Sequence, residues 1–588
     1  MLPNPESLEL EKHIAEGCST PQKQRGLQVS PHTMLLTCIR FGAKTDICPD
    51  QPHQSMKIHS SISPKIARTK AEKQRSEFFR TAVALMSENK HALVFEETAK
   101  VLQSSPNDAE MWNLLGVAAT VSQGRASAEV AFQRAVALNP RYREAWMNYA
   151  NVTANQHKLD EALAAYRQIL ALKPTPDIHS TILFLQQKLE RDPEALYAAH
   201  LEYGRIYGGR KAKPFKNDPD PNRKLRIGYV SGDFREHSVA FFIEPILAHH
   251  DHEQVEVHAF SNGAPDYVTA RLKPHFDHWH DVRKLDDLAL FRLIRDRRID
   301  VLVDLAGHTN LNRLPVFGMR AAPVQASWFG YMATTGLVEM DYRLTDRHTC
   351  TAAHQRYYTE QLYPLGGAVV WNPAPEAPPV APPPYLKNGH ITFASLNNFA
   401  KVTPDVLATW AELLRAVPDA VLVIVAIGAS TKTFQEPVRR VFASVSAEER
   451  LVFVEQQPLD KFLGLFEHFD IALDPFPYNG GTTTLHTLWA GVPLVTLAGT
   501  SEIERSGQGC LNVVGLAREL TARSPEQYVQ IAADLARSPQ KLVEWRNTMR
   551  DKLLASPLMA FETRARNLEA AYRDMFQRYC AQAQHANT

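Results

Sequence analysis

Residues 479–493, NGGTTTLHTLWAGVP, place two glycines and three threonines at the start of an apolar helical pattern. The N-terminus of a helix presents unpaired N–H groups and the positive end of the helix dipole, so it can bind an anion. Glycines let the backbone approach a ligand closely, and threonine hydroxyls add hydrogen-bond donors. The motif predicts a phosphate site, with an ordinary threonine-capped helix as the alternative. Its candidate residues are Gly480, Gly481, Thr482, Thr483 and Thr484.

The stretch SLNNFAKVTPD, residues 395–405, lies between a strand-like run and a helical pattern. Thr403 and Pro404 are typical of the cap and first turn of a helix. Lys401, just before that helix, is expected to point towards a cleft and neutralise a diphosphate, with Asn398 close to it in sequence. A solvated surface lysine is the more ordinary alternative.

A third candidate, SGDFREHS (231–238), follows the first strand-like run of the α/β pattern and contains Asp233 and His237, four residues apart. If the segment is helical, both side chains lie on one face and can share a substrate hydroxyl. A histidine is suited to general-base work or to holding an acceptor. The chain has 23 histidines, so a structural loop histidine is the alternative.

These motifs indicate how negative charge is neutralised. The glycine-rich motif lacks the glycine-lysine-serine/threonine ending of a P-loop, and no Asp-x-Asp pair that could hold Mg²⁺ accompanies it. A lysine and a helix N-terminus can stabilise a departing nucleoside diphosphate without a metal. We therefore expect no metal and no cofactor, and a site suited to transfer from a nucleotide sugar.

The elements around these motifs alternate between strand-like and helical patterns. The alternation predicts two doubly wound α/β domains, residues 209–371 and 386–545, joined by the proline-rich linker NPAPEAPPVAPPPY at 372–385. Ligands of such sheets bind beyond the carboxyl ends of the strands, so the cleft between the domains is the expected site. A helical tail is expected at 546–588, packed back across the first domain.

The N-terminal part repeats with a 34-residue period, in which aromatic residues recur at Phe78, Trp112 and Trp146, and prolines at 106, 140 and 174. This period is the tetratricopeptide (TPR) signature and predicts helical repeats over residues 71–208. Such arrays hold a peptide or protein in their concave face, so a protein partner is expected. Residues 1–70 show no sustained period and are predicted to be a poorly ordered extension.

Composition narrows the class of protein. The chain has 588 residues, 44% apolar and 22% charged, with a net charge of +1, which argues against nucleic acid or an anionic membrane as partner. Six cysteines without a CxxC pair favour reduced thiols and no zinc site. Neither a signal peptide nor an apolar run long enough to span a membrane is recognisable, so we expect a cytoplasmic protein.

From about residue 72 to 575 the chain resembles the bacterial O-linked N-acetylglucosamine (O-GlcNAc) transferase homologues. The resemblance implies a TPR α-solenoid followed by a GT-B glycosyltransferase of two Rossmann-like domains, and an inverting transfer of GlcNAc from UDP-GlcNAc to serine or threonine hydroxyls of proteins. The matching stretches are LRIGYVSGDFREHSVAFFIEP, DLAGHTN, APVQASWFGYMATTG, MDYRLTD, NNFAKVTPDVLATWAELL and LDPFPYNGGTTTLHTLWAGVPLVTLAG.

The family motifs imply roles for individual residues. His237 matches the proposed active-site histidine, and Asp233 matches a rival base candidate. Asn398 and Lys401 match a diphosphate-binding pair. Thr482 and Thr483 match phosphate-binding threonines, and Gly330, within APVQASWFGYMATTG, is assigned to the same nucleotide-sugar site.

The chain also departs from the animal enzymes. Gly481 stands where they carry a histidine, His486 where they carry a ribose-binding aspartate, and Phe462 where they carry a histidine beside the uracil. An aromatic ring at Phe462 can still stack on a base. Several motifs look closer to plant SPINDLY-type relatives, which use GDP-fucose. A protein O-fucosyltransferase, a UDP-glucose enzyme and a TPR scaffold with an inactive transferase domain are therefore the alternatives.

Overall fold

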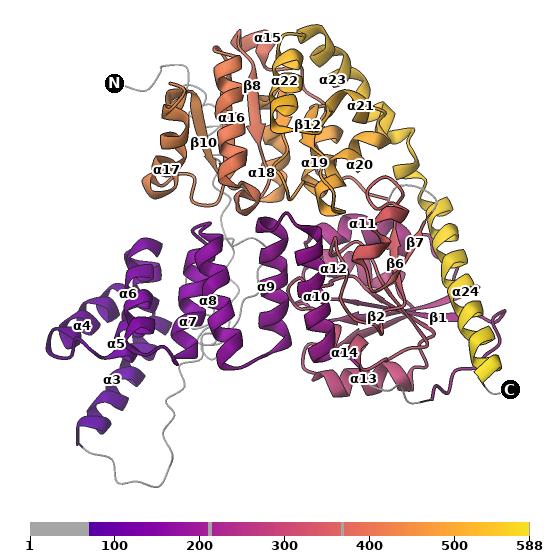
Figure 1. The fold of residues 1–588 in the computed structure, drawn as a ribbon, viewed down its shortest axis with the longest axis horizontal. Helices are drawn as coiled ribbons and strands as arrows, with labels where there is room; N and C mark the ends of the chain where they lie inside the picture. The colour runs from indigo at the N-terminus through magenta and orange to yellow at the C-terminus, as the bar shows by residue number, and fades with distance from the viewer. Residues whose placement is uncertain (1–69, 210–213, 366–369, 587–588) are drawn as a thin grey trace. The chain divides into compact units, whose positions relative to one another are not determined.

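The computed structural model describes residues 70–209, 214–365 and 370–586 (Figure 1). Their contacts form two units, one that ends at Leu185 and one that begins at Gln186. The extension predicted for residues 1–70 lies outside the described residues, apart from its last position. No helix in the described ranges is both long and apolar enough to cross a membrane.

The first unit consists of helices in antiparallel pairs, as the 34-residue period predicts. Trp112 and Trp146, one period apart, each donate an indole hydrogen bond to a proline carbonyl six residues earlier, at 2.8 and 2.9 Å. Ala128 and Ala162 are fully buried, so the paired helices approach closely. The helices are α3 (Lys70–Ser87), α4 (His91–Ser104), α5 (Ala109–Ser122), α6 (Arg125–Leu138), α7 (Arg143–Ala154), α8 (Leu159–Leu172) and α9 (Pro176–Leu189), in which the unit boundary falls.

The helical layer predicted to run to residue 208 is thus divided between the two units. The next helix, α10 (Pro193–Tyr207), packs against the first α/β domain. A Cβ atom on Gly204 would lie 1.8 Å from the carbonyl oxygen of Gly336, so only glycine allows this approach of helix to loop. This helix therefore belongs to the unit that carries the α/β domains.

The first α/β domain contains a seven-stranded parallel sheet with the order β3-β2-β1-β4-β5-β6-β7. Its strands are β1 (Leu225–Ser231), β2 (Val255–Ser261), β3 (His278–Asp281), β4 (Val301–Asp304), β5 (Val324–Ser327), β6 (Tyr342–Thr345) and β7 (Gln361–Pro364). Its helices are α11 (Ser238–Leu247), α12 (Tyr267–Leu272), α13 (Asp287–Asp296) and α14 (Leu314–Gly318), with 3₁₀ turns η1 (Lys273–His275) and η2 (Ala352–Tyr357).

The second α/β domain contains a six-stranded parallel sheet with the order β10-β9-β8-β11-β12-β13. Its strands are β8 (Thr392–Ser395), β9 (Val421–Ala426), β10 (Leu451–Glu455), β11 (Ile471–Leu473), β12 (Leu494–Leu497) and β13 (Thr521–Ala522). Its helices are α15 (Tyr385–Asn388), α16 (Pro404–Ala416), α17 (Lys432–Ala443), α18 (Leu459–Gly464), α19 (Thr482–Trp489), α20 (Ser506–Val513), α21 (Ala517–Leu520), α22 (Pro525–Ala536) and α23 (Pro539–Leu554), with 3₁₀ turns η3 (Phe399–Lys401), η4 (Glu448–Arg450), η5 (Leu465–His468), η6 (Ile503–Arg505) and η7 (Pro557–Met559).

The cores explain why both sheets read as continuous apolar runs in the sequence. Alternate residues of β9 enter two separate apolar clusters, one on each face of the second sheet. Helices cover both faces, as expected for a parallel sheet. In the predicted C-terminal tail (546–588), α24 (Phe561–Ala586) buries Leu568, Tyr572 and Phe576 in the core of the first domain (Figure 1). Each such side chain contributes about 1.5–3 kcal/mol of apolar burial. The start of that range, up to Leu554, instead belongs to α23, which packs in the core of the second domain.

Candidate active site

The glycine-threonine motif forms the link between β11 and α19, as its sequence predicts. Gly481 is the N-cap of α19 and provides no side-chain hydrogen bond to the first helical turn. Thr482 and Thr483 begin the helix and are half-buried, whereas Thr484 is fully buried. The start of this helix therefore presents backbone N–H groups that its own cap residue does not satisfy, which is the arrangement of an anion site.

Asp474, at the end of β11, holds this loop in place. Its carboxylate accepts hydrogen bonds from the Gly480 backbone N–H at 2.7 Å, the Thr496 hydroxyl at 2.7 Å and the Asn397 amide at 3.4 Å. Complete burial raises the pKa of Asp474 to about 7, although these hydrogen bonds and the charge of Lys401 act to lower it. The side chain thus ties the ends of β8, β11 and β12 to the glycine loop.

Lys401 lies at the end of η3, between β8 and α16, where the sequence predicts it. Its ammonium group donates to the Asn479 carbonyl at 3.1 Å and to Asn397 Oδ1 at 3.5 Å, and it lies 4.6 Å from the centre of the Tyr478 ring. Thr403 caps α16 by accepting from the Val406 N–H, as expected. The lysine is therefore held against the glycine loop rather than being a solvated surface residue.

Asn398 has a local role in the same turn. Its side chain accepts a hydrogen bond from the Ala400 backbone N–H at 2.9 Å and caps η3, the turn that carries Lys401. The residue before it, Asn397, is 2% exposed and contacts both Asp474 and Lys401. The adjacent asparagines thus shape the turn and the lysine position together.

Three buried polar atoms around the motif have no hydrogen-bond partner in the described part of the chain: Asn479 Oδ1, Thr484 Oγ1 and His486 Nδ1. Buried polar groups in folded proteins are almost always hydrogen-bonded, so each needs a partner from solvent or a ligand. His486 also packs its ring against Phe241 and Trp371, with ring centres 5.1 and 5.2 Å away. Burial lowers the pKa of His486 to about 4, so the ring is neutral in the folded protein at neutral pH.

Asp233 and His237 are brought together, but not by a helix. Residues 234–237 form bends, and α11 begins at Ser238. His237 is the N-cap of α11, and its Nδ1 accepts the Val239 backbone N–H at 3.2 Å and lies 3.7 Å from an Asp233 oxygen. Because Nδ1 is an acceptor here, the neutral imidazole carries its proton on Nε2.

A shallow pocket of about 290 Å³ adjoins His237. It is lined by residues of α11, α12, the proline-rich linker and α18 of the second domain. Phe241, one helical turn after His237, also lines it and contacts His486 of α19. The histidine and the glycine-threonine helix thus meet across the junction of the two α/β domains. Phe462 is half-buried in α18, its ring centre 5.5 Å from that of Phe466.

Close backbone packing accounts for two glycines of the predicted site. A Cβ atom on Gly330 would lie 1.7 Å from the Leu305 carbonyl oxygen. At Gly480 a Cβ atom would lie 2.6 Å from Thr484 Oγ1 and 2.9 Å from Asn397 Oδ1. Both positions therefore require glycine for the fold itself; contact of either residue with a sugar nucleotide stays a prediction.

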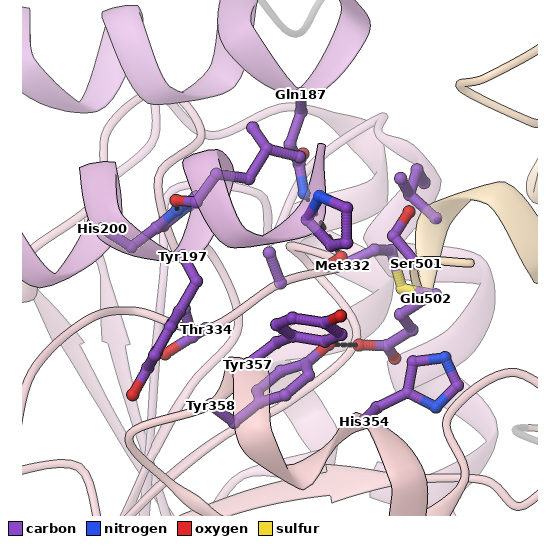
Figure 2. Close-up of a pocket in the computed structure, with 14 residues that line it drawn as sticks. Gln187, Tyr197, His200, Met332, Thr334, His354, Tyr357, Tyr358, Ser501 and Glu502 are labelled. Atoms are coloured by element: carbon purple, nitrogen blue, oxygen red, sulfur yellow. Dashed lines mark hydrogen bonds between the residues drawn. The ribbon is translucent and has the colours of Figure 1, made fainter. Parts of the chain in front are cut away.

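A second pocket, of about 420 Å³, lies where α10, the first domain and η6 of the second domain meet (Figure 2). Glu502, which lines this pocket, forms a buried ion pair with Arg343 at 3.0 Å and accepts a hydrogen bond from the Tyr358 hydroxyl at 2.6 Å. Glu502 and Arg343 come from different α/β domains, so this pair helps to fix their junction. Both carboxylate oxygens of Glu502 have partners within the protein, whereas Nε of the buried Arg343 has no hydrogen-bond partner among the described residues.

The sequence profile of the family described as Glycosyl transferase family 41 matches residues 177–368 and 384–568. These ranges cover more than half of the chain and include α10, both α/β domains and the start of α24. The chain belongs to glycosyltransferase family 41. The profile begins inside α9, close to the boundary between the two structural units.

Two plant proteins are similar in sequence to this chain. A Hordeum vulgare protein described as "Probable UDP-N-acetylglucosamine--peptide N-acetylglucosaminyltransferase SPINDLY" is 38% identical over 406 residues, which are 66% of this chain and 42% of that protein. The Arabidopsis thaliana protein of the same description, but named SEC, is 29% identical over 379 residues, 62% of this chain and 38% of that protein. The chain spans less than half the length of these curated relatives.

A solved structure extends the similarity to most of this family 41 chain. A mutant of the Thermobaculum terrenum O-GlcNAc transferase superposes with a TM-score of 0.77 at 32% sequence identity, covering 88% of this chain and all of that one. The match supports the predicted architecture of helical repeats followed by two Rossmann-like domains, a GT-B fold.

The sequence motifs did not single out Asp474 or Tyr478. The signal that could have revealed Asp474 is an aspartate at the end of a strand, just before the glycine pair.

Proposed function

We propose that this family 41 chain is a protein O-GlcNAc transferase, which moves GlcNAc from UDP-GlcNAc to serine or threonine hydroxyls. The names of the relatives pair UDP-N-acetylglucosamine with a peptide acceptor. The observation that carries the proposal is Lys401, held by Asn479 and Asn397 beside the uncapped N-terminus of α19. A positive charge and free N–H groups together suit the diphosphate of a sugar nucleotide.

In this reaction the acceptor oxygen attacks the anomeric carbon and the bond from that carbon to the β-phosphate oxygen breaks. The hydroxyl proton leaves to a base, and UDP leaves with the negative charge. Lys401 and the first turn of α19 stabilise that charge as it develops. Attack opposite to the leaving group inverts the anomeric configuration.

His237 supports the acceptor side in one of two ways. With Nδ1 accepting from Val239, the Nε2–H group can donate to an acceptor or sugar oxygen and position it. To take the proton itself, the ring must move its own proton to Nδ1 and give up the bond from Val239. Asp233 is the rival base, and its side chain is 5% exposed. No metal is needed for the charge balance proposed here.

The unpaired polar atoms favour a ligand with several hydroxyl groups. Thr484 Oγ1 and His486 Nδ1 can each accept or donate one hydrogen bond, as a ribose or a sugar ring would offer. Phe462 can stack on a base of either kind, so its aromatic ring does not distinguish uracil from guanine. GDP-fucose is therefore the alternative donor, and the test must separate the two.

The deciding experiment is calorimetric titration of the purified chain with UDP, GDP, UDP-GlcNAc and GDP-fucose, followed by mass spectrometry of a peptide pool incubated with each sugar nucleotide. Binding of UDP and addition of GlcNAc are expected. Preferential binding of GDP and addition of fucose would replace the donor, and binding without transfer to any peptide would favour an inactive scaffold.

The helical repeats are proposed to hold the acceptor protein, in a cytoplasmic enzyme. Asn148 of α7 is 3% exposed and donates to Asn113 of α5 at 2.8 Å. This buried bond joins α5 to α7, which belong to successive helix pairs of the array. Acceptor recognition by these repeats is therefore expected to rest on other side chains.

A further inference from the structure

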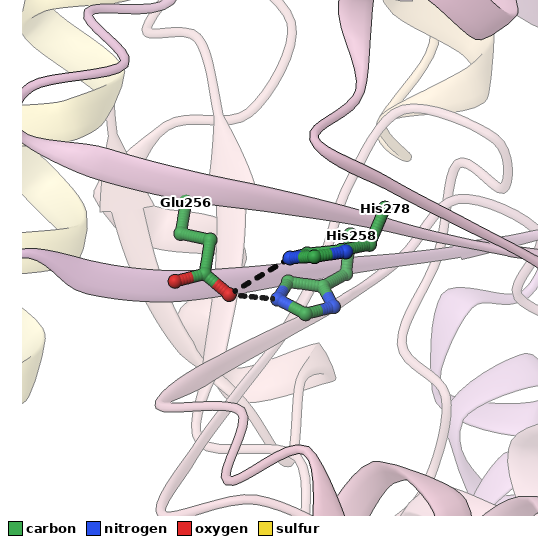
Figure 3. Close-up of side chains that lie close together, drawn as sticks. All are labelled: Glu256, His258 and His278. Atoms are coloured by element: carbon green, nitrogen blue, oxygen red, sulfur yellow. Dashed lines mark hydrogen bonds and ion pairs between the residues drawn. The ribbon is translucent and has the colours of Figure 1, made fainter.

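Three side chains that could bind a metal ion lie together in the first sheet (Figure 3). Glu256 and His258 are two residues apart on β2, so they share a face of the sheet. His278 begins β3 and pairs in register with His258 on the neighbouring strand. One ligand atom from each of the three residues lies within 4.8 Å of the other two. We call these residues the β2–β3 cluster.

We propose that the β2–β3 cluster binds one divalent transition-metal ion of the zinc class and thereby joins β2 to the edge strand β3. Two imidazoles and one carboxylate are a donor set that zinc takes in proteins, with a further position left for water. The sequence predicts no zinc site because that expectation used the cysteines alone. The pattern that reveals this one is Glu-x-His in one strand and histidine at the start of the next.

Two of the three distances between donor atoms are close to those found around such an ion. Oε1 of Glu256 lies 2.8 Å from His258 Nε2 and 3.3 Å from His278 Nε2. Ligand atoms about 2.0–2.1 Å from a tetrahedral ion are about 3.3 Å apart. The longer distance therefore already matches, and the shorter one has to open by about half an ångström. His278 is 45% exposed, so an ion can reach the site from solvent.

His280 supplies the outer partner that a metal-binding histidine requires. Its Nε2 lies 3.3 Å from Nδ1 of His258. If His258 binds the ion through Nε2, its Nδ1–H donates to His280, which fixes the ring orientation. An imidazole with its proton on Nδ1 can accept this bond at Nε2.

Charges of both signs surround the cluster. Arg226 Nε lies 3.6 Å from Glu256 Oε2, the oxygen that does not face the histidines. The other oxygen, Oε1, faces both histidines and is the one that an ion would bind. The arginine weakens attraction of a cation without occupying the liganding oxygen.

The position of the cluster indicates a structural role rather than one in transfer. Glu256 and His258 lie in the first half of β2, and His278 is the first residue of β3. The Asp233 segment follows the carboxyl end of β1, which runs parallel to β2. The cluster is therefore at the amino-terminal side of the sheet, away from the strand ends that carry the candidate active site.

The test is zinc titration of the untagged full chain after EDTA treatment, by calorimetry and by thermal unfolding, with Co²⁺ absorption as a second probe. One saturable site that raises the melting temperature is expected. His278→Gln and Glu256→Gln should remove the site, and His280→Phe should weaken it about 10–100-fold. His252→Gln is the matched control, because His252 pairs with a single carboxylate, Asp277, and should keep the site.

Two further outcomes decide the proposal. Arg226→Gln should tighten zinc binding, because it removes a positive charge beside Glu256. EDTA should lower the melting temperature of the wild-type chain and leave its glycosyl transfer unchanged. Absence of a saturable site, or equal zinc binding in His278→Gln and wild type, would overturn the inference whatever the chain transfers.

Discussion

In each α/β domain a parallel strand ends in a loop that leads into a helix, but the two helices differ in how their N-termini are capped. After β1, the N-terminus of α11 is closed by the His237 ring, which accepts the Val239 N–H. After β11, the N-cap Gly481 has no side chain to close α19. The same layout therefore fixes an imidazole in the first domain and leaves a helix end open to an anion in the second.

The largest expected effect concerns His237, the side chain that caps the N-terminus of α11. His237→Asn should lower transfer by about 10²–10⁴, the usual contribution of general-base assistance, while donor affinity is nearly unchanged. Asparagine is among the best N-cap residues, so this variant keeps the cap of α11 that His237→Ala loses. Comparing the two variants separates the role of the imidazole in transfer from its role as the N-cap of α11.

Transfer rate, donor affinity and melting temperature are to be measured on the same samples. His237→Ala should show the same loss of transfer and an additional loss of about 1 kcal/mol in stability, because its cap is gone. Near-normal transfer by the folded asparagine variant would show that the ring serves only to close the helix.

Turnover should depend almost as strongly on Lys401, the lysine beside the uncapped N-terminus of α19. Lys401→Ala should lower turnover by about 10²–10³, by analogy with loss of one oxyanion donor worth roughly 3–4 kcal/mol. Lys432→Ala is the matched control, an exposed lysine at the start of α17 in the same domain. Single-turnover kinetics measure the effect, and a folded Lys401→Ala protein with normal rates would remove the lysine from the mechanism.

A third prediction concerns His486, which joins the two helices through its contact with Phe241. Burial lowers its pKa from 6.5 to about 4, so the unfolded chain binds the extra proton first as the pH falls. The neutral His486 therefore leaves the free energy of unfolding unchanged above pH 6.5 and lowers it by about 3 kcal/mol as the pH falls to about 4.

His486→Leu should therefore be less sensitive to acid than the wild-type chain. The difference in unfolding free energy between the two, from urea titrations at pH 7.5 and pH 4.5, isolates this residue. Asp474 has a raised pKa, so it has the opposite pH dependence: its protonated form favours the folded state below pH 4, and this contribution is lost as the pH rises to about 7. Because Asp474 is present in both chains, its contribution cancels in the comparison. An acid sensitivity equal in both chains would mean that the folded protein accepts a charged His486.

Much of this comparison could be predicted from local sequence. Glycine, threonine and proline mark the loops and helix starts, and Lys401 and Thr403 lie where these signals place them. The roles of Asp474 and His486 could not be predicted in this way, because they depend on burial and on partners more than twenty residues away. The docking of α10 is of the same kind, since it rests on the close approach of Gly204 to Gly336.

The smallest expected effect comes from closing the open helix end with a neutral group. Gly481→Ser places a hydroxyl at the N-cap of α19, where a Cβ atom meets open space. The hydroxyl can accept a first-turn N–H, so it competes with a bound phosphate by about 1 kcal/mol. The dissociation constant for UDP should rise about fivefold, while the melting temperature of the ligand-free protein stays the same or increases.

Gly464→Ser is the control, because its added Cβ also meets open space but lies at the end of α18. Unlike removal of Lys401, the serine changes neither charge nor the loop that Asp474 holds. A weaker affinity together with unchanged or higher stability would identify the backbone N–H groups themselves as phosphate ligands. Unchanged affinity in Gly481→Ser would instead mean that the phosphate is bound by side chains alone, and the contrast between α11 and α19 would then have no part in donor binding.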